Sequence, residues 1–281
     1  MAHPVANTFA QAAELTGRED RRQGNCLNFS AGDHIICTGD IHGHRRNLAK
    51  VVGFADLGAH PNRRLILQEL LHGGLTDSAG GDRSVELLLR TARLKITYPD
   101  RVFFLMGNHD LAQFTGNEIT KAGVGQCAAF DAGLDHSFGA DAAEVRRAAG
   151  EFLRSLPLAA KCENGLFISH SLPGPARMGL MDWDILDREY QPDDLRRGGS
   201  VYELLWGRGH TPEQLTELGD KLNVRYFLLG HEPVPSGFEI RHDRAVIIAS
   251  DDSHGAVAVF DAGAELRPEE LPGLVRPIVA L

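Results

Sequence analysis

Short apolar runs alternate with amphipathic segments over the first part of the chain. The runs at residues 35–37, 65–67 and 101–106 are dominated by apolar side chains with β-branched or aromatic members, which predicts strands buried on both faces. Between them, apolar positions within 48–55 and 85–96 recur every three or four residues, so each segment predicts a helix with one buried face. The order strand, helix, strand, helix, strand predicts a βαβαβ unit with parallel strands and right-handed crossovers.

The pattern changes after residue 110. Residues 111–157 show helical periodicity, and we expect them to form a helical insertion beside the parallel strands. Residues 158–169 contain two short apolar runs around an Asn-Gly pair, which predicts a β-hairpin. A further strand is expected over 226–229, and three more within 238–260 are expected to form an antiparallel run.

These elements predict a single α/β domain over residues 31–262, with the helical insertion at 111–157 inside it. Residues 1–30 are polar and weakly patterned, so we expect a peripheral N-terminal segment that contains one helix. Residues 263–281 are punctuated by proline and are expected to form a C-terminal tail. The chain has 281 residues, of which 43% are hydrophobic, and this is enough to bury a sizeable core.

Charge and cysteine content restrict the partners and the compartment. The formal net charge of -9 disfavours nucleic acid, because a non-specific nucleic-acid binder presents a basic face. No apolar run approaches the roughly 18 residues that a membrane span needs, so no membrane association is expected. The four cysteines include no CxxC pair, and no basic region followed by an apolar core stands at the N-terminus. We therefore expect reduced cysteines and a cytoplasmic location.

Polar side chains with metal-ligand chemistry follow the predicted strands, where catalytic groups collect in open α/β sheets. These residues are Asp40, His42, Glu69, Asn108, His109, His170 and His231. Two carboxylates, an amide and four imidazoles are enough to bind two metals about 3.5–4 Å apart, with one histidine left over. Oxygen and imidazole donors suit Mn, with Fe or Zn as alternatives. Water held between two cations loses a proton near neutral pH, and the spare histidine can donate a proton to a leaving group.

Five motifs in this order resemble those of the calcineurin-like metallophosphoesterases, and within them the phosphoprotein (Ser/Thr) phosphatase family. They are GDIHG at 39–43, GNHD at 107–110, the single His170, LLWGR at 204–208 and GH at 230–231. The resemblance covers roughly residues 33–260. It implies the metallophosphoesterase fold, a four-layer α/β/β/α sandwich of two mixed sheets flanked by helices.

The resemblance also implies a role for each matching residue. Asp40 and His42 would bind one metal, and Asn108, His170 and His231 would bind the other. His109 would be the general acid. Arg208 matches an arginine that binds the substrate phosphate, to which a guanidinium fork is well suited, and Asn108 would contact the substrate as well.

The chain departs from the family in its second motif, GD-x-x-DRG. Glu69 stands where an aspartate that bridges the metals is expected, and Asp82-Arg83 follows only after a Gly-rich stretch. We interpret this as a motif split by an insertion, in which Asp82 orients His109 and Arg83 binds phosphate; the alternative is an ordinary helix start. His72 is either a solvated loop residue or a ligand in place of Glu69. We predict Glu69 as the bridge, because a carboxylate has two oxygens whereas a neutral imidazole has one free lone pair.

The function implied is hydrolysis of phosphate monoesters by attack of a metal-bound hydroxide, most simply by a phosphoprotein (Ser/Thr) phosphatase. A phosphorylated protein or a small phosphate ester would be the partner. One alternative is hydrolysis of dinucleoside polyphosphates of the diadenosine tetraphosphate type. Another is a catalytically degenerate scaffold that keeps the fold, although unpaired buried ligands are costly to retain without a metal. The sequence leaves the oligomeric state open.

Overall fold

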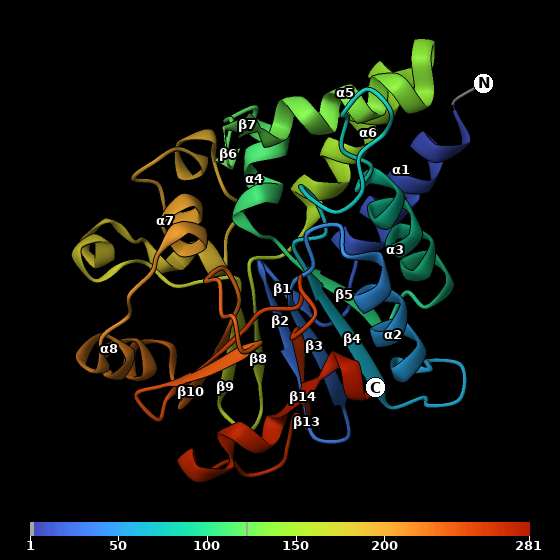
Figure 1. Ribbon diagram of the computed structural model, residues 1–281. Coiled ribbons are helices and arrows are strands. Elements are labelled where there is room, and N and C mark those ends of the chain that lie inside the picture. Colours follow the sequence, from blue (N-terminus) through green and yellow to red (C-terminus); the bar gives the residue numbers. More distant parts are fainter. Residues whose placement is uncertain (1–2, 122) are drawn as a thin grey trace.

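The computed structural model describes residues 3–121 and 123–281 and contains two large mixed sheets (Figure 1). The five-stranded sheet has the order β14-β13-β3-β4-β5. Its strands are β3 (His34–Asp40), β4 (Arg63–Gln68), β5 (Val102–Leu105), β13 (Ala256–Asp261) and β14 (Val275–Pro277). Strands β3, β4 and β5 are parallel, so the predicted βαβαβ unit is confirmed, with α2 (Arg45–Ala55) and α3 (Val85–Thr97) as its crossover helices.

The second sheet has seven strands in the order β1-β2-β8-β9-β10-β12-β11. Its strands are β1 (Arg22–Gln23), β2 (Cys26–Phe29), β8 (Ala159–Cys162), β9 (Leu166–Ser169), β10 (Tyr226–Leu229), β11 (Phe238–Arg241) and β12 (Ala245–Ile248). The predicted hairpin is present as the antiparallel pair β8 and β9, while β10 runs parallel to β9. A separate two-stranded ribbon joins β6 (Thr120–Lys121) to β7 (Val124–Gly125).

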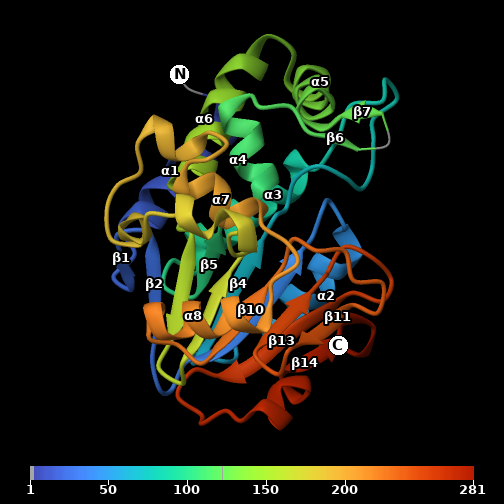
Figure 2. The ribbon, with the colours of Figure 1, turned by 90° about the vertical axis from the view of Figure 1, so that its left-hand side faces the viewer.

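Helices cover the outer faces of both sheets (Figures 1 and 2). Besides α2 and α3, the helices are α1 (Pro4–Gly17), α4 (Asn108–Thr115), α5 (Gln126–Phe138), α6 (Ala142–Ser155), α7 (Ser200–Trp206) and α8 (Pro212–Leu222). Six short 3₁₀ turns complete the described secondary structure, at 139–141, 175–180, 183–186, 192–195, 268–274 and 278–280. In this part of the chain, no helix has both the length and the apolar character needed to cross a membrane.

Alternate residues of each strand enter different hydrophobic cores. Ile35 and Cys37 of β3 join a cluster with Ile168 and Val246 of the other sheet, so this cluster lies between the sheets. Ile36, between them in sequence, belongs to the cluster that includes the helices. Side chains of a strand point alternately to its two faces, and here both faces are buried. The result is the predicted four-layer α/β/β/α sandwich.

The first thirty residues are part of the packed fold, whereas the sequence predicted a peripheral segment. Phe9 and Ala12 on α1 are fully buried, and α1 packs against α3 and α6. Strand β2 pairs with β8 in the seven-stranded sheet. The buried face of α1 is formed by Val5, Ala6, Phe9, Ala12 and Thr16, which recur at helical spacing.

The prediction of one antiparallel run over residues 238–260 is also wrong in part. Strands β11 and β12 pair as expected, but β13 lies in the other sheet, antiparallel to β3. The polar turn 250–255 carries the chain from one sheet to the other. An isolated bridge between Asp40 and Ala249 joins the two sheets at this point. The crossing brings the end of β12 to the end of β3, where the sequence places the first motif.

Candidate metal centre

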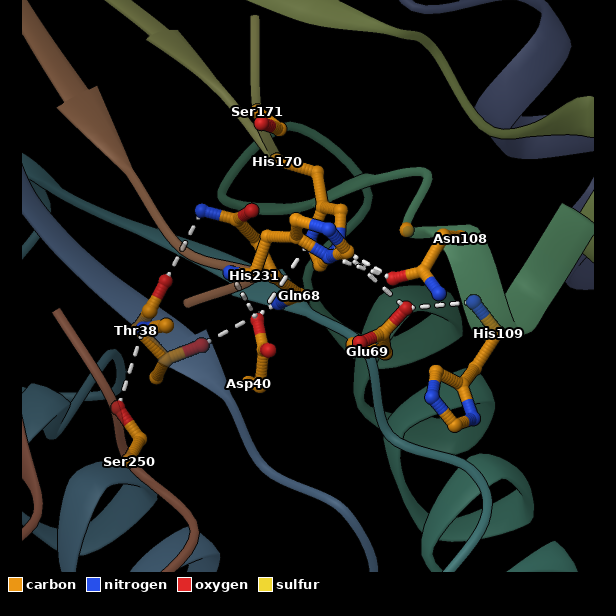
Figure 3. Close-up of polar contacts among 12 residues, drawn as sticks. Thr38, Asp40, Gln68, Glu69, Asn108, His109, His170, Ser171, His231 and Ser250 are labelled. Atoms are coloured by element: carbon orange, nitrogen blue, oxygen red, sulfur yellow. Dashed lines mark hydrogen bonds and ion pairs between the residues drawn. The ribbon is translucent and has the colours of Figure 1, made fainter. Parts of the chain in front are cut away.

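Six of the seven residues predicted from the sequence come together where strands of the two sheets end (Figure 3). The seventh, His42, lies with its Nε2 atom 3.5 Å from Glu69. Asp40 ends β3 and Glu69 follows β4, while Asn108 and His109 open α4 shortly after β5. His170 and His231 follow β9 and β10 of the other sheet. The site is therefore built from both sheets.

The backbone at this site is unusually strained for residues with side chains. Four of the eight described non-glycine residues with positive φ lie here: His42 at 41°, Glu69 at 41°, His72 at 61° and His231 at 66°. A non-glycine residue in this region costs roughly 1–3 kcal/mol and persists where the surrounding structure holds it, often at functional sites. These backbone conformations direct the four side chains into the site and lower the stability of the fold.

Asp40, His42 and Glu69 form the first group of donors. The Nδ1 atom of His42 lies 2.9 Å from the carbonyl oxygen of Leu71. A carbonyl can only accept, so this nitrogen carries the proton and Nε2 keeps its lone pair. The Nε2 atom lies 3.5 Å from Glu69 Oε2 and 4.0 Å from Asp40 Oδ2. A ligating histidine is typically oriented by a carbonyl in this way.

Asn108, His170 and His231 form the second group, around the amide oxygen of Asn108. That oxygen lies 2.8 Å from His170 Nε2 and 2.8 Å from His231 Nδ1, and these two nitrogens are 3.1 Å apart. The Oε1 atom of Glu69 lies 3.6 Å from His170 Nε2. One oxygen donor and two nitrogen donors, from the start of α4 and from the ends of β9 and β10, thus lie within 3.1 Å of one another.

Burial makes this cluster costly without a cation. Burial raises the pKa of the Glu69 carboxyl well above its ordinary value and also raises that of Asp40. It lowers the pKa of His170 strongly and that of His231 to about 3, so both imidazoles are neutral at neutral pH. Glu69 Oε2 and His170 Nδ1 are buried without a hydrogen-bond partner. Neutral imidazoles and carboxylates, one of them with an unsatisfied oxygen, are the donor set that a hard or borderline cation satisfies.

Glu69 is shared between two sets of atoms that fit a metal. In His42, Glu69 and His109, one ligand atom from each lies within 4.8 Å of the others, and the same holds for Asp40, Glu69 and His170. No other residue belongs to both sets. This placement favours Glu69 as the bridge over the alternative ligand His72.

Two glycines allow the carboxylates to approach so closely. A Cβ atom on Gly107 would lie 2.3 Å from Glu69 Oε1, and one on Gly230 would lie 2.6 Å from Asp40 Oδ1. Neither distance is sterically possible without movement. The glycines of the GNHD and GH motifs are therefore needed for space at the metal centre.

The donors open into a cavity of about 270 Å³. Arg208 and Lys121 line it together with the acidic Glu232 and Asp251. Arg208 donates through Nε to Nε2 of His231 over 3.0 Å. Lys121 belongs to the β6–β7 ribbon, so part of the 111–157 segment does reach the site.

A larger hollow of about 660 Å³ lies elsewhere on the surface. Its His34 and Asp261 pair with each other, so the site is identified by chemistry rather than by size.

Asp82 and Arg83 do not occupy the positions that the split-motif interpretation predicts. The carboxylate of Asp82 accepts hydrogen bonds from the backbone N–H groups of Gly73 at 3.0 Å and Ser84 at 2.6 Å, so it shapes the loop before α3. Arg83 forms an ion pair with Glu86 and is not among the residues that line the cavity. The alternative interpretation, an ordinary helix start, fits this geometry.

His72 occupies the place beside His109 that was predicted for Asp82. Its ring is fully buried, and its Nδ1 atom lies 2.8 Å from Nδ1 of His109. It is neither a solvated loop residue nor a member of either ligand set. The signal lay in the aligned stretch, because the second aspartate of GD-x-x-DRG stands three residues after the first, as His72 stands three after Glu69. Burial, followed by His42 and His72, lowers the pKa of His109 to about 2.

Comparisons with known proteins agree with this geometry. A family model described as calcineurin-like phosphoesterase matches residues 34–235. Human serine/threonine-protein phosphatase 5 is 26% identical over 262 residues, which cover 84% of this chain and 48% of that protein. Serine/threonine-protein phosphatase T of Trypanosoma brucei brucei is 22% identical over 233 residues, covering 77% of this chain and 45% of that protein. The chain spans about half the length of these curated relatives.

Solved structures show the same fold at low sequence identity. A protein serine/threonine phosphatase from Saccharomyces cerevisiae, with similarity to human phosphatase PP5, superposes with a TM-score of 0.70 at 18% identity. The match covers 94% of this chain and 86% of that one. A cold-active protein-tyrosine phosphatase of a psychrophilic Shewanella species gives a TM-score of 0.61 at 14% identity, over 88% of this chain and 79% of that one.

Proposed function

Because the chain belongs to the calcineurin-like phosphoesterase family, we propose that it is a metal-dependent hydrolase of phosphate monoesters with a dinuclear centre bridged by Glu69. The observation that carries this proposal is the position of the Glu69 carboxylate between the two groups of donors. Its Oε2 lies 3.5 Å from His42 Nε2, and its Oε1 lies 3.6 Å from His170 Nε2. A degenerate scaffold would have no reason to retain a fully buried carboxylate oxygen, Oε2 of Glu69, without a hydrogen-bond partner.

The residues divide between two metals as the motifs imply. Asp40 and His42 would hold one ion, and Asn108, His170 and His231 would hold the other. When bound, the ions would acidify a water molecule and offset the negative charge of the phosphoryl group. Mn, Fe and Zn all suit this mixture of oxygen and imidazole donors.

Arg208 would bind the substrate phosphate. His231 turns Nδ1 toward Asn108 and His170, and a metal on Nδ1 requires the proton of the neutral ring to be on Nε2. That nitrogen could then no longer accept the hydrogen bond that Arg208 donates to it over 3.0 Å. Metal binding would therefore free Nε of Arg208, while its Nη2 could still donate to the carbonyl oxygen of His231 over 3.4 Å. The guanidinium group lies at the cavity, and such a group can bind two phosphate oxygens at once.

His109 would be the general acid. Its ring lines the cavity and is neutral in the free site, since its pKa is lowered to about 2. A phosphate dianion bound beside the ring would favour the charged imidazolium and so raise the pKa. The proton of that imidazolium would then pass to the leaving oxygen.

Phosphorylated serine or threonine in a protein is the proposed substrate class. Relatives that cover most of this chain are named as serine/threonine phosphatases, although their identity is low. The cavity is partly open, and cationic Lys121 and Arg208 line it together. This arrangement suits a phosphorylated side chain presented on a peptide.

A substrate panel with added Mn²⁺ tests the proposed function. Purified full-length chain is incubated with phosphoserine and phosphothreonine peptides, a phosphotyrosine peptide, an aryl phosphate and diadenosine tetraphosphate, each with Mn²⁺ or with EDTA. We expect Mn²⁺-dependent release of phosphate from the phosphoserine and phosphothreonine peptides. Arg208→Ala should lower kcat/KM, whereas the exposed Arg93→Ala serves as a matched control and should not.

Two results would contradict parts of the proposal. Faster cleavage of diadenosine tetraphosphate than of any peptide would show that dinucleoside polyphosphates are the preferred substrate class. Chain that binds two equivalents of metal but hydrolyses none of the substrates, with Mn, Fe or Zn, would favour the scaffold.

A further inference from the structure

The ring of His72 is held by polar partners at both nitrogens. Nδ1 lies 2.8 Å from Nδ1 of His109, and Nε2 lies 2.8 Å from Oε1 of Gln113. The ring is fully buried and packs edge-on against Phe130. Its backbone has a φ of 61°, so the chain holds a non-glycine residue in the left-handed region to place this imidazole.

The partners of this ring determine where its proton resides. The amide nitrogen of Gln113 donates to Oδ1 of Asp131 over 3.1 Å, and that carboxylate forms an ion pair with Arg146 at 2.9 Å. An ionised carboxylate can only accept, so the NH₂ group of Gln113 faces Asp131 and its oxygen faces His72. An amide oxygen also only accepts, which puts a proton on His72 Nε2.

The same reasoning continues to His109. A neutral His72 that is protonated on Nε2 has a free lone pair on Nδ1 and can accept one hydrogen bond there. Among the described residues, the hydrogen-bond partner at that position is Nδ1 of His109, 2.8 Å away, which must therefore be the donor. His109 is left with Nε2 as its second nitrogen, on the side of the ring away from His72.

We propose that His72 is a positioning residue for the general acid: its neutral imidazole accepts the Nδ1 proton of His109 and holds Nε2 of His109 free for the substrate. The proposal rests on the proposed function, in which His109 is the acid. A carboxylate at position 72 would orient the ring of His109 as well. However, it would add a negative charge beside a site that already buries Asp40, Glu69 and Asp110. A neutral acceptor orients the acid without that charge.

His72 keeps the same protonation state throughout the proton transfer. In the charged form, His109 carries protons on both nitrogens and donates the Nδ1 proton to His72 as a hydrogen bond. As the oxygen of a water molecule bonds to phosphorus, the bond between phosphorus and the leaving oxygen breaks, and phosphate is released. The electron pair of the broken bond stays on the leaving oxygen, which takes the Nε2 proton. The product is an alcohol, and His109 returns to the neutral form with Nδ1 still protonated.

Two substitutions that tolerate the left-handed backbone test this role. His72→Gly removes the acceptor without backbone strain, and His72→Asn keeps an oxygen close to the position of Nδ1. For each variant, kcat/KM is measured on a phosphoserine peptide, which has a poor leaving group, and on p-nitrophenyl phosphate, which needs little protonation. We expect the ratio of the first to the second to fall about ten- to a hundredfold in His72→Gly and to recover largely in His72→Asn. Parallel losses on both substrates, or no recovery with asparagine, would overturn the proposal.

The proton positions can be measured without activity. Nitrogen NMR of the full chain labelled with ¹⁵N-histidine and loaded with diamagnetic Zn²⁺ should show a protonated Nδ1 in neutral His109 and a protonated Nε2 in His72. Spectra of His72→Asn and His109→Asn assign the signals. The opposite tautomer at His109 would refute the arrangement even in an active enzyme. The expected tautomers in a chain that hydrolyses none of the substrates would instead support the arrangement and contradict the proposed function.

Discussion

Gly107 allows the backbone at the start of α4 to lie close to the carboxylate of Glu69. The residue lies at the start of α4, and its missing side chain leaves room for Oε1 of Glu69, which accepts the N–H of His109 over 2.7 Å. A glutamate has one methylene more than an aspartate, so its carboxylate must be accommodated further from its own backbone. The glycine and the longer acid are therefore matched to each other.

Gly107→Ala should displace Glu69 and weaken metal binding more than it weakens folding. The new Cβ would lie 2.3 Å from Glu69 Oε1 and 2.8 Å from its carboxyl carbon, so the carboxylate must move. We expect fewer than two equivalents of bound Mn²⁺ by elemental analysis and a loss of turnover of at least tenfold. Gly53→Ala, on α2, is the matched control because a Cβ there meets nothing within 4 Å. Equal metal content in the two variants would show that Glu69 does not need this space.

Single residues were predictable from the sequence where their chemistry and motif agree. Asp40, His42, Asn108, His170 and His231 do converge as expected, and their metal-binding roles remain proposals. The role of Asp82 was predicted from a familiar dipeptide, and the structure instead uses its carboxylate to hold two backbone N–H groups. The sequence did not predict that His72 lies beside His109. A histidine acts as acceptor or donor according to its partners, and the partners of His72 are distant in sequence.

Among the elements, the segment just after α1 is joined to α3 by a buried ion pair. Lys95 on α3 is fully buried and donates to Oε1 of Glu19 over 2.5 Å, to the carbonyl of Pro99 over 2.7 Å and to that of Val102 over 2.9 Å. Glu19 lies just after α1 and its side chain is 2% exposed. The pair therefore ties the N-terminal segment to the end of α3 and to the start of β5.

Glu19→Gln should be strongly destabilising, because it leaves a buried ammonium group without its counter-charge. The expected loss in the free energy of unfolding is about 3–5 kcal/mol, measured by urea denaturation. Glu14→Gln is the matched control, since its ion pair with Arg18 is exposed, and it should leave the midpoint unchanged. A double substitution, Glu19→Leu with Lys95→Met, should lose less stability than Glu19→Gln alone. A Glu19→Gln chain as stable as the control would show that the pair has no structural role.

The sequence predicted the strands with continuous apolar runs correctly, but it did not predict which sheet each strand joins. The strands at 35–37, 65–67 and 101–106 are buried on both faces, so their continuous apolar runs identify them. Strand β13 has the same character, and its sequence cannot indicate which of two sheets it joins. That choice depends on the pairing of Val257 with Thr38 and its neighbours, more than 200 residues apart in the chain.

At the scale of the whole molecule, the site lies where the two sheets meet. Asp40, Glu69 and Asn108 follow strands of the five-stranded sheet, while His170 and His231 follow strands of the seven-stranded sheet. The isolated bridge from Asp40 to Ala249 and the hydrogen bond from His231 N–H to Asp40 Oδ1 at 3.1 Å join the two halves. A dinuclear centre assembled this way depends on the packing of the sheets and would in turn hold them together.

Anomalous diffraction from a crystal of the Mn²⁺-loaded full chain tests the central claim most directly. The dinuclear proposal predicts two manganese peaks about 3.5–4 Å apart, with one oxygen of the Glu69 carboxylate directed at each or one oxygen between them. Asp40 and His42 should contact one peak, and Asn108, His170 and His231 the other. Two occupied sites with the Glu69 carboxylate directed away from both, or a single peak at saturating Mn²⁺, would contradict it.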